Sequence, residues 1–162
     1  MADRASVIRA FLARVPAKLT GMNMARRQRG TRYESSGNSF YLWGHVVAHW
    51  INRDKIQLCH RGHETQLTKE TLNEIISYIG LGRCNIVQEK HKWNLRCRVE
   101  GTSRVKKIPW PSSGCISVTP RNLSWIKEMQ ASAQATQAAQ RTRVAARQET
   151  TRLREERKVE RA

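Results

Sequence analysis

The stretch from Ser39 to Val99 constrains the fold most, because it holds the apolar periodicity needed to build a core. Residues 40–50 alternate between two faces and are rich in aromatic and β-branched side chains, which predicts a strand. The Asn52–Lys55 cluster predicts a turn, and Ile56–Cys59 a returning strand. The core is therefore expected to begin with an antiparallel hairpin.

A helix is predicted after this hairpin. Thr68 is expected to cap its first turn, and Gly80 is expected to end it, because glycine adopts the left-handed conformation of a helix C-terminus without strain. Its apolar residues recur on a 3.6-residue period and form one stripe, made of Leu72, Ile75, Ile76 and Ile79.

A second hairpin is predicted from Cys84 onward, with a turn at residues 90–92. On its returning strand, Arg96 and Arg98 alternate with apolar residues, so we expect an edge strand that presents both arginines outward. Trp110 lies between two prolines and is expected to cover the sheet, while residues 115–118 predict one last strand.

These elements predict an α+β fold. A small antiparallel sheet, built in the order β-hairpin, helix, β-hairpin, is expected to form a core domain over residues 36–118. Residues 1–35 predict a basic N-terminal segment, with an amphipathic helix at 6–15 followed by an arginine-rich arm without regular structure. Thr119 and Pro120 predict the start of a long charged C-terminal helix that occupies residues 119–162.

The core also carries a family resemblance over roughly residues 30–118. Its segments are GTRYESSGNSFYLWGHVVAHW, IQLCHRGHETQLTKETLNEI, IVQEKHKWNL and IPW. This series resembles a group of small phage- and prophage-encoded proteins of uncharacterised function. The resemblance implies a phage gene context and supplies no mechanism. The residues shared with that group are Thr65, Thr68, Lys69, Leu72, Asn73, Gln88 and Trp93.

The chain departs from this group at three places. Trp43-Gly44-His45 replaces the group's His-Gly-Asn, His63 stands in place of a tryptophan, and Asn94 stands in place of a tyrosine.

The net charge of +17 favours a polyanionic partner. We therefore predict a non-enzymatic phage-type accessory protein that binds DNA or RNA mainly through phosphate contacts. Tyr41, Trp43 and Trp93 are possible stacking platforms for bases beside the arginines. The predicted nucleic-acid-binding residues are Arg26, Arg27, Arg29, Arg32, Arg96, Arg98, Lys106, Lys107, Arg141, Arg143 and Arg147.

Two other functions fit the same charge. One is an inhibitor or modulator that binds an acidic host protein, with the C-terminal helix as its interaction arm. The other is a small basic structural subunit of a virion or ribonucleoprotein particle. Basic charge that only keeps a small protein in solution is the simplest alternative, although ordinary small domains carry net charges of about 2–8.

The four cysteines are expected to be reduced, because no signal peptide is recognised and a cytoplasmic location in the host follows from the phage-like core. An arginine-rich start also fits a mitochondrial transit peptide, but Asp3 argues against it. No membrane span is expected. Cys59-His60-x-x-His63 suggests zinc but lacks a paired Cys-x-x-Cys, so neither a metal nor any other cofactor is expected. No catalytic constellation is recognised, so no enzymatic activity is predicted.

Overall fold

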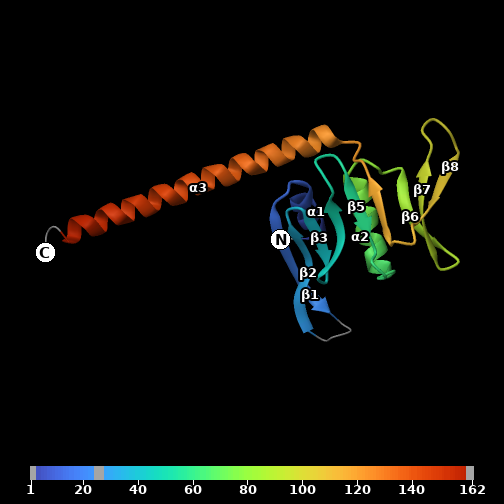
Figure 1. The fold of residues 1–162 in the computed structure, drawn as a ribbon, viewed down its shortest axis with the longest axis horizontal. Helices are drawn as coiled ribbons and strands as arrows, with labels where there is room; N and C mark the ends of the chain where they lie inside the picture. The colour runs from blue at the N-terminus through green and yellow to red at the C-terminus, as the bar shows by residue number, and fades with distance from the viewer. Residues whose placement is uncertain (1–2, 24–27, 160–162) are drawn as a thin grey trace.

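The computed structural model of the protein describes residues 3–23 and 28–159. Three helices and two antiparallel sheets form within these residues, which confirms the predicted α+β class (Figure 1). The larger sheet has six strands in the order β1-β2-β3-β4-β5-β9, and the smaller sheet has three in the order β6-β7-β8. The elements are α1 (Arg4–Leu12), β1 (Pro16–Asn23), β2 (Gln28–Ser36), β3 (Ser39–Leu42), β4 (His45–Trp50), β5 (Ile56–Cys59), α2 (Gln66–Tyr78), β6 (Cys84–Glu89), β7 (Lys92–Arg98), β8 (Val105–Pro109), β9 (Cys115–Val118) and α3 (Leu123–Val159).

One hydrophobic core joins both sheets and all three helices. Helix α1 contributes Phe11, whose ring centroid lies 6.0 Å from those of Phe40 and Trp50. Helix α2 contributes the predicted apolar stripe, all of which is fully buried. Ile126 in the first turn of α3 is also buried, so the start of the long helix docks on the domain.

The predicted arm around Arg29 and Arg32 is wrong in the part that the structure describes. β1 and β2 pair antiparallel over eight register positions and extend the six-stranded sheet. Tyr33 is buried against Phe40, with ring centroids 6.2 Å apart. Strands are recognised in a sequence by the alternation of apolar and polar residues. The arginines of this segment interrupt that alternation, so the strand was not predicted. Arg26 and Arg27 lie outside the described residues.

The single strand predicted over residues 40–50 is also wrong. A two-residue turn at Trp43-Gly44 divides it into β3 and β4, and both turn residues have positive φ, 51° and 82°. Positive φ at both central positions is the conformation that joins adjacent antiparallel strands. A β-bulge between Phe40 and Tyr41 accompanies this turn.

Helix ends differ from the prediction by a few residues. Asp3 caps α1, accepting a 2.7 Å hydrogen bond from the backbone N–H of Ser6. Thr65, and not Thr68, caps α2 through a hydrogen bond from the Thr68 N–H. Thr119 and Pro120 precede α3 without starting it, since the first turn closes on the carbonyl of Asn122.

Asn73 on α2 pairs with the free edge of β6. Its side chain donates to the carbonyl of Ile86 and accepts from the N–H of the same residue, at 3.3 and 2.6 Å. The amide thereby satisfies the two backbone groups that a neighbouring strand would otherwise bond. The resemblance to phage proteins rests partly on Asn73. In the structure this residue connects helix α2 to the three-stranded sheet.

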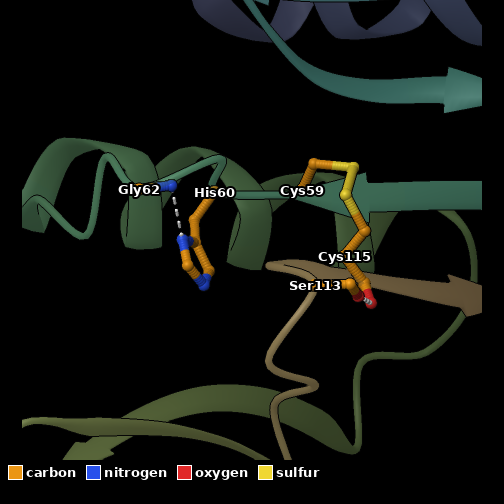
Figure 2. Close-up of a disulfide and its surroundings, with 5 residues drawn as sticks. All are labelled: Cys59, His60, Gly62, Ser113 and Cys115. Carbon is orange, nitrogen blue, oxygen red and sulfur yellow. Dashed lines mark hydrogen bonds between the residues drawn. A yellow bond between two sulfur atoms is a disulfide. The ribbon is translucent and has the colours of Figure 1, made fainter.

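Both cysteine pairs are disulfide-bonded, which corrects the expectation of reduced thiols. Cys59 and Cys115 lie directly opposite each other on β5 and β9, as do Cys84 and Cys97 on β6 and β7. Figure 2 shows the first of these bridging its two strands beside His60. The prediction rested on the expected cellular compartment, whereas each pair is set by the register of neighbouring strands within one sheet. With its thiol in this bond, Cys59 does not supply the zinc ligand that the sequence suggested.

Candidate nucleic-acid interface

The outer face of the three-stranded sheet gathers arginines from strand β7 and from the loop before β6. Arg96 and Arg98 alternate along β7 with the core residues Leu95 and Cys97. Both arginine side chains therefore project from the face of the sheet that is turned away from the core. β7 is the central strand of this sheet, not the predicted edge strand, since β8 pairs along its other side.

Arg83 joins this face although the sequence prediction omitted it. The N–H of Arg98 donates to the carbonyl of Arg83 at 2.9 Å, which extends the β6–β7 ladder by one position. Residues directly opposite in an antiparallel ladder share a face. The turn holds two residues, Lys90 and His91, and not the three predicted at 90–92. Counting outward from the predicted turn would have paired Arg83 with Val99 instead. The cationic face, as we name it, surrounds a hollow of about 420 Å³ lined by Gly82, Arg83, Cys84, Asn85, Arg96, Arg98 and Val105.

Charge pairing on the cationic face is incomplete. Arg83 lies 3.3 Å from a carboxylate oxygen of Glu100, and Lys107 pairs with Glu89. In the described part of the chain, neither Arg96 nor Arg98 has a carboxylate within 4 Å. Both are exposed, so their guanidinium forks are available to an external anion.

The two predicted lysines of β8 lie on different faces of the three-stranded sheet. Lys107 lies opposite Arg96 and therefore belongs to the cationic face. Lys106 lies opposite Cys97 and belongs to the other face of the sheet. The structure therefore brings Lys107 together with Arg96 and Arg98 and separates Lys106 from them.

The remaining predicted cations lie elsewhere. Arg29 and Arg32 belong to β2 in the other sheet, and the guanidinium carbon of Arg32 lies 5.3 Å from the centroid of the Tyr33 ring. On α3, Arg143 and Arg147 are one turn apart and line the same shallow hollow, whereas Arg141 lines a different one. The predicted residues that the structure describes thus do not form one surface.

Aromatic residues do not flank the cationic face as the sequence suggested. Trp93 is 3 % exposed and lies on the core side of β7, whereas Arg96 of the same strand lies on the outer side. Trp43 is partly buried in the β3–β4 turn, and Tyr41 belongs to β3. Stacking beside Arg96 and Arg98 is therefore not available to these three side chains.

Replacing Glu89 by glutamine is expected to raise affinity for an oligonucleotide roughly threefold, because it releases Lys107 from an exposed ion pair. The hydrogen bond from Lys107, and then its charge, lower the pKa of Glu89 against the opposing effect of burial. The pair is thus complete above the ordinary pKa of glutamate and is lost as pH falls through the lower folded pKa. The difference between wild type and E89Q should shrink over that fall in pH. Equal affinities at neutral pH would show that Lys107 does not contact the nucleic acid.

None of the three helices in the described part of the chain has an apolar stretch of the length that a bilayer span requires. The fold and the cationic face define a small basic α+β protein with a long projecting helix. A sequence profile described as Kyanoviridae Gp96 protein matches residues 21–117, more than half of the 162-residue chain. The chain belongs to this phage protein family, which confirms the phage resemblance of its core. No curated protein and no solved structure matches it.

Proposed function

We propose that this phage protein is a non-enzymatic accessory factor that binds nucleic acid through phosphate contacts on the cationic face. The observation that carries the proposal is the placement of Arg96 and Arg98 beside Arg83 around one hollow, without carboxylate partners for the first two. Arginine forks match phosphate oxygens in bidentate geometry, and successive outward positions on a strand lie about 6.6 Å apart. That spacing is similar to the distance between phosphates along a nucleic-acid strand.

The charge of the whole chain supports the same function. A net charge of +17 attracts a polyanion over a long range and raises its association rate. Exposed Arg143 and Arg147 on α3 add a second basic surface that is able to follow a phosphate backbone. We assign this activity to the host cytoplasm. Glutathione and thioredoxin would reduce the two disulfides there.

The direct test measures fluorescence anisotropy of labelled random 20-nucleotide oligomers, single-stranded and duplex, titrated with the full chain at low salt. Binding of either oligomer in the micromolar range or tighter supports the proposal. Absence of binding to both, with the protein folded by circular dichroism, rejects it.

A host-protein modulator is the second candidate, and the exposed length of α3 favours it. This helix extends away from the domain in Figure 1, and Val144 and Leu153 are 48 % and 45 % exposed. A pull-down from host lysate after nuclease treatment separates the two functions. A partner retained by the full chain and lost when α3 is truncated after residue 134, together with no oligomer binding, supports the modulator.

A further inference from the structure

A second pocket opens at the end of the small sheet away from Arg98. It has a volume of about 200 Å³ and lies where the loop after β5 meets the ends of β7 and β8. That volume is below the range of about 300–1,000 Å³ of pockets for drug-sized ligands, so the pocket accepts a single small ring system. Its lining residues are His60, Glu64, His91, Lys92, Trp93, Asn94, Pro109, Trp110, Pro111 and Ser112.

Three aromatic rings form the wall of this pocket. The centroid of the His60 ring lies 5.1 Å from that of Trp93 and 5.9 Å from that of Trp110, and the two indoles are 5.8 Å apart, edge to face. Backbone contacts fix the cluster. The backbone N–H of Trp110 donates to the Trp93 carbonyl at 2.9 Å. His60 Nδ1 accepts from the backbone N–H of Gly62 at 3.0 Å, as Figure 2 shows.

Two of the lining residues carry a buried hydrogen-bond donor that has no acceptor in the described part of the chain. The indole Nε1 atoms of Trp93 and Trp110 are both buried and unpartnered within the described structure. A buried donor without a partner is costly, and tryptophan usually satisfies its N–H when buried. A ligand whose acceptor atoms reach either indole N–H would remove this cost.

One lysine lies at the mouth of the pocket. His91 and Lys92 are exposed at the β6–β7 turn, next to the aromatic wall. The only carboxylate among the lining residues is Glu64, 3.5 Å from Nε2 of His60. A ligand that suits this site has a flat ring with acceptor atoms inside and a negative charge at the mouth.

We infer that this pocket takes one unstacked nucleobase of a single-stranded nucleic acid, an inference that rests on the proposed function. Ring nitrogens and exocyclic oxygens of a base supply acceptor atoms, the partly exposed Trp110 ring contacts its plane, and the phosphate beside it meets Lys92. Arg96 lies four residues beyond Lys92 on the same outward side of β7, so the cationic face holds the phosphates that follow.

The test compares two 12-nucleotide ligands with identical phosphates, oligothymidylate and a fully abasic strand, by anisotropy with the full chain. The wild type is expected to bind oligothymidylate about tenfold more tightly than the abasic strand. Trp110→Phe keeps a ring and removes one N–H, and should reduce this preference to about twofold without changing abasic affinity. Trp125→Phe is the matched control, because Trp125 is a surface tryptophan on α3, 41 % exposed, and its preference should stay tenfold.

The outcomes separate this inference from the function on which it rests. Equal binding of both ligands by the wild type overturns the base pocket and leaves the phosphate interface in place. A preference that persists in Trp110→Phe shows that the base binds elsewhere and also overturns it. Failure of both ligands to bind rejects the proposed function together with the pocket. Unchanged abasic affinity in Trp110→Phe shows that the variant is folded.

Discussion

Replacing Arg96 and Arg98 together by glutamine is expected to lower affinity for a random single-stranded 20-mer about 100-fold at low salt. Each arginine forms charge-assisted hydrogen bonds of about 1.5–3 kcal/mol, and about 1.4 kcal/mol changes affinity tenfold. Both side chains are exposed and unpaired in the described residues, so no internal ion pair is lost with them. Anisotropy titration of wild type and variant gives the ratio.

A matched control separates the effect of where the two arginines lie from the effect of losing two positive charges. Arg9 and Arg121 are exposed arginines on α1 and before α3, and changing both to glutamine removes the same two charges. This variant should lose less than about threefold, because its charges act only through the long-range field of the protein. Equal losses in the two variants would mean that net charge alone determines binding and that the cationic face has no special role.

Phe11→Ala is expected to lower the free energy of unfolding by about 3–5 kcal/mol, the usual cost of emptying a buried phenylalanine site. Phe11 has no exposed surface and packs against the rings of Phe40 and Trp50. Its carbonyl also accepts the Trp50 indole N–H at 3.2 Å. Urea denaturation followed by circular dichroism measures the change.

Ile51→Ala is the control for this substitution, because Ile51 is 47 % exposed and should cost less than about 1 kcal/mol. A similarly small loss in Phe11→Ala would show that α1 is an appendage. The expected large loss would show that the N-terminal helix is part of the domain core, as its buried face indicates.

Local periodicity is what made parts of this fold predictable. Helix α2 and the β6–β7 hairpin follow directly from the spacing of apolar residues between Leu72 and Cys97. The outward positions of Arg96 and Arg98 follow from the same alternation. Within the candidate interface, these two residues and Lys107 were identified from the sequence and are found together.

Features set by long-range pairing were not predictable in this way. The place of β2 in the sheet depends on its pairing with β1 and β3, and its arginines suggested a solvated arm instead. The Cys59–Cys115 disulfide joins residues that lie 56 positions apart in the chain. The aromatic pocket joins His60 to Trp110 across two sheets, so spacing along the sequence gives no sign of it.

The salt dependence of oligonucleotide binding tests the central claim most directly. For single strands, log K falls against log salt with a slope of about −0.7 for each phosphate neutralised. Three arginines on the cationic face therefore predict a slope of about −2 or steeper for the wild type, becoming shallower by about 1.4 when Arg96 and Arg98 are glutamine. A slope near zero between about 50 and 200 mM salt would contradict phosphate binding by this face.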